Sequence, residues 1–504
     1  MKYNKQKNTI RVIFCINLFI LIFAGCTSIQ QPHYTFNQKQ PASKLREDLI
    51  LLQKILEADH PSLYWYTSKD SIDYYFNATI QSISDSLTEI QFRNKLAIAV
   101  SKIRCGHTSV HLSKAYNKLY NKNRYPQFPL NIKTWQDSLV VVSNFWPEDT
   151  ILKRGTIITG INGIRNKILL DSIFQFISVD GYSDNLKSQV ISFNFPVWYQ
   201  SVFGLGSSYT IQYIDTLGKE TNASIKSIKL QDTLRKNKLT HPITIFGRKP
   251  SGKETRKARL LNKRNIKLDD SLHTAFIHLA TFNGGRLRTF FRQSFRNIAH
   301  QHIKNVVIDI RENGGGNVDQ YVLLAKYLAD TSFKVGDTIA AVRRNLKYKK
   351  YIQSSWFYSF LMSLSTRKLK DGRFHQHYLE TFYHKPKKRL HFNGPIYLIQ
   401  GGFTFSASAM FAATLKNQKN VTIAGEETGG AYYGNSAMFI PDITLPNSHL
   451  RVRLPLFRLV IKKDRVKDGR GVLPDIYIPP SSEAIKKGVD IKMVKIKEMI
   501  KKNQ

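Results

Sequence analysis

Two glycine-rich turns carry the residue types best suited to chemistry. The first follows the apolar run 306–310, typical of a buried strand, and contains Gly314, Gly315 and Gly316. Glycines before a helix let backbone N–H groups point at an anion. The second turn, residues 401–409, puts Ser406 at a strand-to-helix junction among small residues, where its hydroxyl is able to act as a nucleophile. The sequence thus offers a nucleophile and anion-stabilising amides on two strand-to-helix turns.

Each turn also has a simpler interpretation. The first could cradle a phosphate, but no Gly-Lys-Ser/Thr follows it, which argues against a nucleotide loop. A lone Ser at a helix start is more often an N-cap, so Ser406 taken alone is not evidence of catalysis.

Four motifs in order resemble the C-terminal-processing (tail-specific) serine protease family. They are Ile308-Asp-Ile-Arg-Glu-Asn-Gly-Gly-Gly316, Ser406-Ala-Ser-Ala-Met-Phe411, Gly425-Glu-Glu-Thr-Gly-Gly430 and Gly469-Arg-Gly-Val-Leu-Pro-Asp-Ile476. This resemblance covers about residues 43–480. It implies a serine-type peptidase acting on peptides or proteins, with an α/β core of the ClpP/crotonase kind and neither metal nor other cofactor.

The base that activates Ser406 distinguishes two branches of this family. One branch uses a Lys twenty-five residues after the Ser, but that position here is Ala431. The chain is more similar to the branch that includes the tricorn core, which implies a Ser-His-acid site. By this resemblance His107, in the sequence Cys105-Gly-His-Thr108, is the general base. Asp468, where the branch usually has Glu, orients it.

The same resemblance implies an oxyanion hole. Its donors would be the N–H groups of Ala407 and of Gly315, with Gly314 or Gly316 as alternatives to Gly315.

Other roles for the charged and thiol groups remain open. His107 could be a capping or surface residue, and Asp468 could be a solvated salt-bridge partner among its basic neighbours. Asp475 is a rival carboxylate, although its place after Pro474 favours a structural role. A catalytic pair of Cys105 and His107 is not expected, because residues so close in sequence rarely meet side chain to side chain. Cys105 is instead expected to be a buried thiol. No histidine spacing typical of metal ligands occurs, and His-Glu-x-x-His is absent.

The middle of the chain resembles a PDZ-type domain through Leu152-Lys-Arg-Gly-Thr-Ile-Ile-Thr-Gly-Ile-Asn-Gly163. Such a domain captures a peptide by adding it as a strand to a sheet edge. The stretch 125–132 is the candidate edge, with Phe128 and Leu130 as substrate-binding residues. A domain serving only as spacer or lid is the alternative.

The expected fold is multidomain α+β. Leucines at 4-3-4 spacing, starting with Leu45 and Leu49, predict helices near the N-terminus. The expected division is a lipoprotein signal peptide (1–25), a tether (26–42), a helical domain carrying His107 (43–113), a PDZ-like domain (124–235), a basic linker (236–268), the α/β catalytic core (269–480) and a basic tail (481–504).

The first residues predict export. A basic start is followed by the apolar run 12–23, which is too short for a comfortable membrane span and suits a signal peptide. Small residues precede Cys26, as in a bacterial lipobox, so Cys26 is the expected lipidation site. The expected location is the cell envelope, anchored by lipid. Cys15 would leave with the signal peptide, so Cys105 would be the sole other thiol and no internal disulfide is expected.

The net charge of +40 is unusually high for a chain with 76 Lys+Arg and 36 Asp+Glu. Removing Lys2, Lys5, Lys7 and Arg11 with the signal peptide leaves 40 − 4 = +36. Much of the excess lies at 253–267, 343–350, 385–389 and beyond 486, which favours an anionic membrane or glycan surface as a neighbour. Dispersed lysines and predicted export argue against nucleic acid. The main functional alternative is a non-catalytic peptide- or ligand-binding lipoprotein on the same scaffold.

Overall fold

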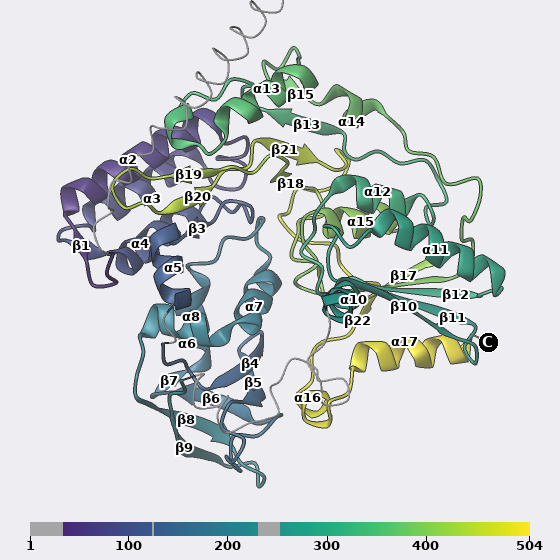
Figure 1. The fold of residues 1–504 in the computed structure, drawn as a ribbon, viewed down its shortest axis with the longest axis horizontal. Helices are drawn as coiled ribbons and strands as arrows, with labels where there is room; N and C mark the ends of the chain where they lie inside the picture. The colour runs from purple at the N-terminus through teal and green to yellow at the C-terminus, as the bar shows by residue number, and fades with distance from the viewer. Residues whose placement is uncertain (1–33, 123–124, 230–251, 504) are drawn as a thin grey trace, which may run out of the picture.

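The computed structural model describes residues 34–122, 125–229 and 252–503. The predicted signal peptide, Cys26 and the first part of the tether lie outside these residues. The fold is multidomain α+β, with a helical N-terminal region, a β-rich middle region and an α/β core (Figure 1). No helix in the described part of the chain is long and apolar enough to cross a membrane.

The N-terminal region is built on three helices, α2 (Ala42–Asp59), α3 (Lys69–Gln81) and α4 (Glu89–Ser101). The leucines at 4-3-4 spacing on α2 are buried, as their periodicity predicts. Thr88 and Gln91 form a capping box that starts α4. This helix ends at Ser101, and Gly106 follows on the loop that carries His107.

The middle region is a sheet in the order β4-β5-β6-β8-β9, with β7 beside β6. The strands are β4 (Leu130–Trp135), β5 (Ser138–Asn144), β6 (Ile157–Ile161), β7 (Ile164–Arg165), β8 (Ser208–Ile214) and β9 (Glu220–Lys226). Its helices are α6 (Asn166–Phe174), α7 (Asp184–Phe193) and α8 (Phe195–Phe203). β4 is an edge strand, as expected for the candidate peptide edge.

Phe128 and Leu130 do not face a ligand in this arrangement. Both side chains have 0% exposure and pack in the core of the middle region with Tyr199 and Tyr209. The prediction that these side chains contact substrate was therefore wrong. Their aromatic and aliphatic surface stabilises the sheet instead.

The α/β core is a six-stranded sheet in the order β10-β11-β12-β16-β17-β22. Its strands are β10 (Arg264–Asp269), β11 (Thr274–Leu279), β12 (Asn305–Asp309), β16 (Ile396–Gln400), β17 (Val421–Gly425) and β22 (Ile476–Tyr477). All neighbouring pairs are parallel except β10 with β11. Every residue of β12 and β16 is buried, which explains the apolar runs within these strands.

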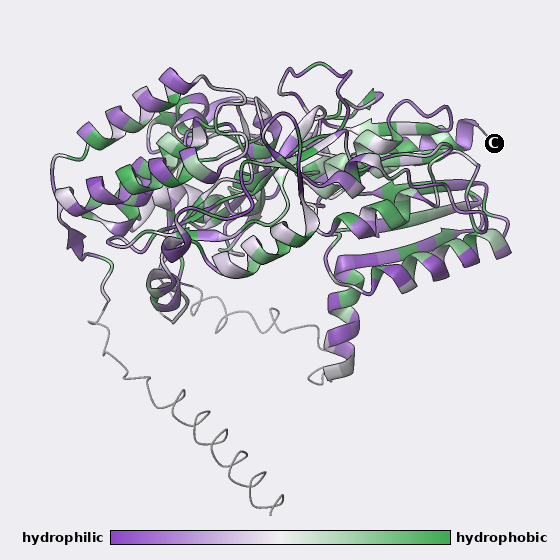
Figure 2. Cartoon of the chain, turned by 90° about the horizontal axis from the view of Figure 1, so that it is seen from above, coloured by the Kyte–Doolittle hydropathy of each residue, from purple (hydrophilic) through white to green (hydrophobic). Residues whose placement is uncertain are grey.

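Helices cover both faces of this sheet. The helices α11 (Leu287–His300), α12 (Val318–Ala325) and α15 (Ala407–Leu415) lie on one face, and α17 (Ile491–Lys502) lies on the other (Figure 1). Side chains alternate along β12, so Ile308 packs in the hydrophobic cluster on the side of α11, α12 and α15, and Val307 packs in the cluster on the side of α17. In Figure 2 the helices alternate hydrophilic and hydrophobic residues along their length, as expected when one face is buried.

Two segments predicted as peripheral belong to the core. Residues 252–268, expected in a basic linker, form α10 (Gly252–Lys263) and most of the edge strand β10. The expected basic tail contains α16 (Ser482–Lys487) and α17, and α17 buries Ile496 and Ile500 against the sheet. In the first segment, Ile266 and Leu268 of β10 pack against the core, whereas α10 has no buried residue among its described side chains.

A second sheet, in the order β14-β15-β13-β21-β18, was not predicted. It consists of β13 (Thr338–Ala341), β14 (Arg367–Lys368), β15 (Phe374–His375), β18 (Gly434–Ala437) and β21 (Phe457–Val460). The strands β19 (Asp442–Thr444) and β20 (Arg451–Arg453) form a small sheet with β3 (Val110–His111). Since β3 closely follows His107, this small sheet ties the His107 loop to the core.

Candidate active site

The two glycine-rich turns lie side by side because β12 and β16 are parallel neighbours. Their carboxyl ends, Asp309 and Gln400, therefore face the same edge, where α/β sheets commonly bind ligands. The backbone N–H of Phe405 donates to the carbonyl of Asn313 at 3.2 Å. The predicted nucleophile turn and the predicted anion-binding turn are thus joined directly.

Ser406 has a backbone conformation that L-residues seldom adopt, with φ 55° and ψ −126°. It follows β16 and immediately precedes α15, so the chain reverses sharply at this residue, as at a nucleophile elbow. The Ser406 side chain makes no capping hydrogen bond to α15. The simple N-cap interpretation is therefore wrong.

His107 reaches Ser406 from the N-terminal region. Its Nε2 lies 3.0 Å from Ser406 Oγ, within hydrogen-bond distance. The two residues are 299 positions apart in sequence, and only the tertiary fold brings them together. In the tautomer with Nδ1 protonated, Nε2 accepts the Ser406 proton, as a general base requires.

The residues flanking His107 are fixed on both sides. The N–H of Gly106 donates to Asp180 Oδ1 at 2.8 Å, and Thr108 Oγ1 lies 2.8 Å from His60 Nε2. A Cβ at Gly106 would lie 2.7 Å from the Phe405 ring, so the close approach requires glycine here. His60 and Asp180 thereby hold the base from the helical and the middle regions respectively.

Burial keeps His107 neutral. It lowers the pKa of His107 from 6.5 to about 3, and the nearby positive charge of Arg453 adds to the effect. The ring of Phe405 stacks on the imidazole with centroids 4.6 Å apart. A neutral imidazole is the form that can take the Ser406 proton.

The structure does not bring Asp468 to His107. His107 Nδ1 is buried and has no hydrogen-bond partner among the described residues. Asp468 is exposed, and its Oδ1 accepts a hydrogen bond from the N–H of Arg470. The rival Asp475 pairs with Lys416 and accepts the N–H of Ile423, which is a structural role. The serine and histidine therefore form a pair without an acid, and the role of Asp468 stays a prediction.

The glycine turn meets the nucleophile closely. A Cβ at Gly315, whose φ is +101°, would lie 2.7 Å from Ser406 Cβ and 3.0 Å from the Ala407 nitrogen. The N–H of Gly315 donates to Asn313 Oδ1 at 3.0 Å. No acceptor within the described ranges takes the N–H of Gly314, Gly316 or Ala407. The glycine turn therefore has two unengaged amides and Ala407, next to Ser406, has a third, while Gly315 supplies the close backbone approach.

The remaining candidate residues take no part in the Ser406–His107 site. Cys105 is a buried free thiol, and burial raises its pKa to about 12, which leaves it un-ionised and weakly reactive. Ala431 is fully buried where the other branch has its Lys. Among the described residues, no group of three or more His, Cys, Asp or Glu is arranged to hold a metal ion.

Sequence reasoning missed three residues that shape the site: Phe405, Asn313 and Asp180. Asp180 is 2% exposed, and burial raises its pKa to about 7. Asn313 stands within a quoted motif and Phe405 lies in the turn 401–409 directly before Ser406, so their positions were a usable signal. Nothing in the sequence around Asp180 indicated that it would meet Gly106.

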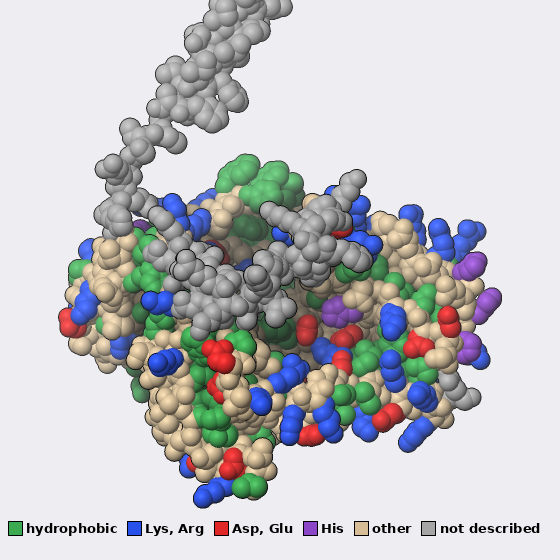
Figure 3. Space-filling model, turned by 60° about the horizontal axis from the view of Figure 1, so that its bottom comes forward, with side chains coloured by type: hydrophobic (Ala, Val, Ile, Leu, Met, Phe, Trp, Pro, Cys, Tyr) green, Lys and Arg blue, Asp and Glu red, His purple; other side chains and the backbone are tan. Residues whose placement is uncertain are grey.

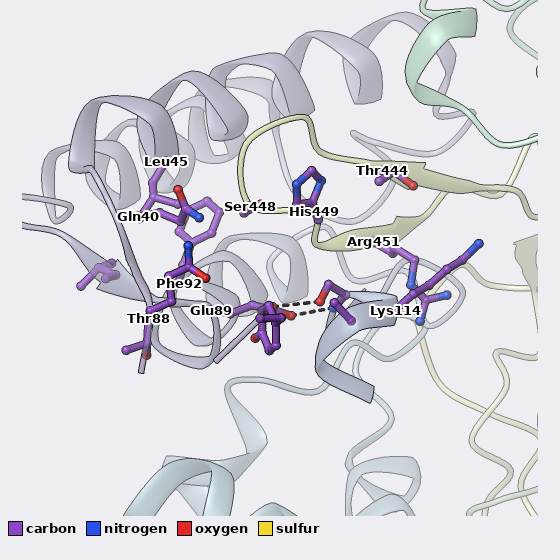
Figure 4. A pocket seen from close by; sticks show the side chains of 15 residues that line it. Gln40, Leu45, Thr88, Glu89, Phe92, Lys114, Thr444, Ser448, His449 and Arg451 are labelled. Atoms are coloured by element: carbon purple, nitrogen blue, oxygen red, sulfur yellow. Dashed lines mark hydrogen bonds between the residues drawn. The ribbon is translucent and has the colours of Figure 1, made fainter. Parts of the chain in front are cut away.

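A separate cavity of about 540 Å³ lies between α2, α4 and the β19–β20 turn (Figure 4). Glu89 at its wall accepts hydrogen bonds from the N–H and hydroxyl of Ser113 and from the hydroxyl of Tyr34. None of the predicted catalytic residues lines it. The Glu89 carboxylate is engaged with the protein, so this cavity does not compete with Ser406 as the candidate active site.

A serine hydroxyl bonded to a buried neutral histidine, at the carboxyl ends of parallel strands, is the arrangement that serine hydrolases use for nucleophilic attack. Residues 273–478 match the family model of Peptidase family S41. The chain therefore carries a Peptidase family S41 domain and is a serine-type peptidase.

Two solved structures of CPAF show the same fold. Mature CPAF matches with TM-score 0.61 and 13% identity, covering 91% of this chain and 97% of that chain. A mutant of CPAF matches with TM-score 0.64 and 13% identity, covering 92% and 97%. The photosystem II D1 C-terminal processing protease matches with TM-score 0.40 and 14% identity, covering 88% and 96%. No curated protein matches the sequence significantly.

Proposed function

We propose that this peptidase is a tail-specific serine endopeptidase in which Ser406 is the nucleophile and His107 the general base. The observation that carries the proposal is the 3.0 Å contact between His107 Nε2 and Ser406 Oγ at a strained strand-to-helix turn. Geometry and protonation state agree, because burial keeps the imidazole in its proton-accepting form.

The reaction follows from these positions. Ser406 Oγ attacks the peptide carbonyl while Nε2 of His107 takes its proton, and the C–N bond breaks as the imidazolium protonates the leaving amine. Water then attacks the acyl-enzyme with the same base, which restores Ser406 and releases the new carboxylate. The N–H groups of Gly314 and Ala407 stabilise the tetrahedral oxyanion, and each such donor is typically worth about 3 kcal/mol.

A fluorophosphonate probe tests the nucleophile. Folded wild-type protein is expected to be labelled, and Ser406→Ala is expected to abolish labelling. Ser408→Ala is the matched control, because Ser408 belongs to the same turn but is fully buried on α15. Absence of labelling on folded wild type would favour the non-catalytic binding protein, which the unpartnered Nδ1 of His107 keeps as second candidate.

Asp468 is proposed as the third member of the site after movement of its loop. At present Gly469 accepts the N–H of Tyr182, and Lys467 donates to the carbonyl of Trp65. Both contacts would have to change for the carboxylate to meet Nδ1. If Asp468 orients His107, Asp468→Asn lowers kcat at least tenfold and Asp464→Asn, in the same exposed loop, does not. Equal activity of the two variants would exclude this role.

Tail specificity and location are parts of the same proposal. A tail-specific enzyme cleaves peptides with a free C-terminal carboxylate faster than their amidated forms. The β4 edge is at present covered by α7, since Thr134 donates its N–H to Ser192 Oγ and its hydroxyl to the Ser188 carbonyl. Export and lipid attachment at Cys26 are supported by the sequence pattern and predict weaker membrane fractionation in Cys26→Ala.

A further inference from the structure

The helix α13 (Ser355–Ser365) presents four of its large apolar side chains to solvent. Trp356 and Leu364 are each 71% exposed, and Phe360 between them is 49% exposed. At four-residue spacing these three side chains share one face. The buried residues of the helix are Ser355, Ser359 and Met362. A surface helix of a soluble protein normally has the opposite orientation, so this face indicates a partner.

The surroundings of α13 are strongly basic. The stretch 343–370 contains no Asp or Glu. Exposed basic side chains precede and follow the helix: Lys347, Lys349, Lys350, Arg367, Lys368 and Lys370. Lys and Arg elsewhere are scattered over the surface, as the face in Figure 3 shows, whereas here they flank an apolar ridge. Apolar centre and cationic margins together match an anionic lipid surface.

We propose that α13 is a membrane-docking helix that lies in the surface of an anionic bilayer. Trp356 and the rings of Phe357 and Phe360 enter the interface, where aromatic side chains are preferred. The flanking lysines and arginines meet lipid phosphates. Trp356 stacks on Phe360 with ring centroids 5.8 Å apart, so a preformed aromatic ridge is available for insertion.

A second copy of the chain is a poorer occupant of this face. A symmetric contact through α13 would bring the same basic residues of both copies together with no acidic residue of the stretch between them. Like charges facing each other in an interface are unfavourable. Figure 1 places α13 at the outer edge of the molecule, where a flat bilayer can reach it. This inference goes beyond the proposed peptidase function and does not depend on Ser406.

Tryptophan quenching in vesicles tests the docking directly. The full-length protein is mixed with phosphatidylcholine vesicles that contain phosphatidylglycerol and carry brominated acyl chains. The chain has five Trp, and the difference between wild type and Trp356→Phe isolates the signal of Trp356. Quenching of Trp356 reports only on α13, so membrane attachment through an N-terminal anchor alone does not produce this signal. Trp356 emission is expected to be quenched and blue-shifted, whereas Trp198→Phe, a control in the middle region, leaves the quenching unchanged.

Two further variants separate the apolar and the electrostatic contributions. Phe360→Ser with Leu364→Ser is expected to reduce quenching of Trp356 by at least about tenfold, and both sites are exposed, so the fold and probe labelling are retained. Lys349→Glu with Lys350→Glu is expected to weaken docking at low but not at high salt. Unquenched Trp356 on anionic vesicles would overturn the proposal. A blue shift of the Trp356 emission that occurs without vesicles, depends on protein concentration and is abolished by Phe360→Ser with Leu364→Ser would also overturn the proposal. That result would identify a contact between two copies of the chain.

Discussion

The phenyl ring of Phe405 covers the imidazole of His107, with ring centroids 4.6 Å apart and an interplanar angle of 29°. The next residue along the chain is Ser406, whose hydroxyl is hydrogen-bonded to the same imidazole. One dipeptide therefore supplies both the nucleophile and the apolar cover of its base. Removing water from one side of the ring helps to keep His107 uncharged.

Replacing Phe405 by Ala tests this cover. Water is then expected to reach the imidazole and raise the pKa of His107 toward 6.5, and kcat/KM is expected to fall about 10- to 100-fold because the base is less well positioned. Phe405→Leu retains apolar contact and is the milder control. The pH profile of kcat/KM checks the prediction, and an unchanged acid limb in Phe405→Ala would show that the ring does not shield the base.

The acid limb of the wild-type profile is a separate prediction. Burial lowers the pKa of His107 to about 3, so the neutral base persists as pH falls well below 6.5. As long as Nδ1 of His107 has no partner, the kcat/KM profile of the free enzyme is therefore expected to stay level from neutral pH to about pH 5. A carboxylate on Nδ1 would stabilise the imidazolium and raise this pKa. A limb near pH 6–7 would thus show that an acid such as Asp468 has joined the site in solution.

The sequence predicted the core because local signals were strong there. The apolar runs before Gly314 and Ser406 indicated buried strands, and the glycines and small residues indicated the turns. These two turns meet because their strands are neighbours, as the pairing of β12 with β16 shows. The proximity of His107 to Ser406 came from the family resemblance, since nothing local connects residues so far apart.

The sequence failed where tertiary context decides. The α17 segment reads as a basic tail, yet residues at four-residue spacing, such as Ile496 and Ile500, are buried against the sheet. Phe128 and Leu130 have the types expected of a binding edge, but strand register turns their side chains inward. The short strands of the second sheet lack periodicity. Asp180 looks like any loop carboxylate until the fold buries it beside Gly106.

Gly315→Ala is expected to impair catalysis more than stability. The added Cβ would lie against Ser406 Cβ and the Ala407 nitrogen, at 2.7 and 3.0 Å, and would disturb the oxyanion donors. Loss of one donor typically lowers kcat about 10²- to 10³-fold. Gly163→Ala is the matched control, because Gly163 also has a positive φ of +79° but open space around it. Equal activity loss in both variants would attribute the effect to backbone strain rather than to the oxyanion site.

The buried Asp180 is expected to make the free energy of unfolding depend on pH. Burial raises its pKa from 3.8 to about 7, so the folded state holds a proton that the unfolded state releases. The free energy of unfolding is therefore expected to decrease as pH rises through this interval, by roughly 2–4 kcal/mol from this group. His60 and His107, with lowered pKa values, contribute the opposite slope between about pH 3 and 6.5.

The Asp180→Asn variant isolates the contribution of Asp180. Its side-chain oxygen can still accept the N–H of Gly106, but it does not titrate. Urea unfolding at pH 5 and pH 8 is expected to show wild type losing more stability than Asp180→Asn between these pH values. Parallel pH profiles would mean that Asp180 does not retain its proton in the folded protein.

The buried pair of Lys492 and Glu426 attaches α17 to the catalytic core. Nζ lies 2.7 Å from Oε2, and both side chains are less than one-tenth exposed. Lys492→Met leaves the Glu426 carboxylate buried without its partner and is expected to cost about 3–5 kcal/mol of unfolding free energy. Replacing both residues, Glu426→Leu with Lys492→Met, is expected to cost less than either single change because no unpaired charge remains.

Lys495→Met, which breaks the exposed pair with Glu498, is the control and is expected to cost at most about 1 kcal/mol. Urea unfolding measures these three variants and the single variant Glu426→Leu, and a Lys492→Met variant as stable as Lys495→Met would show that α17 is held by its apolar face alone.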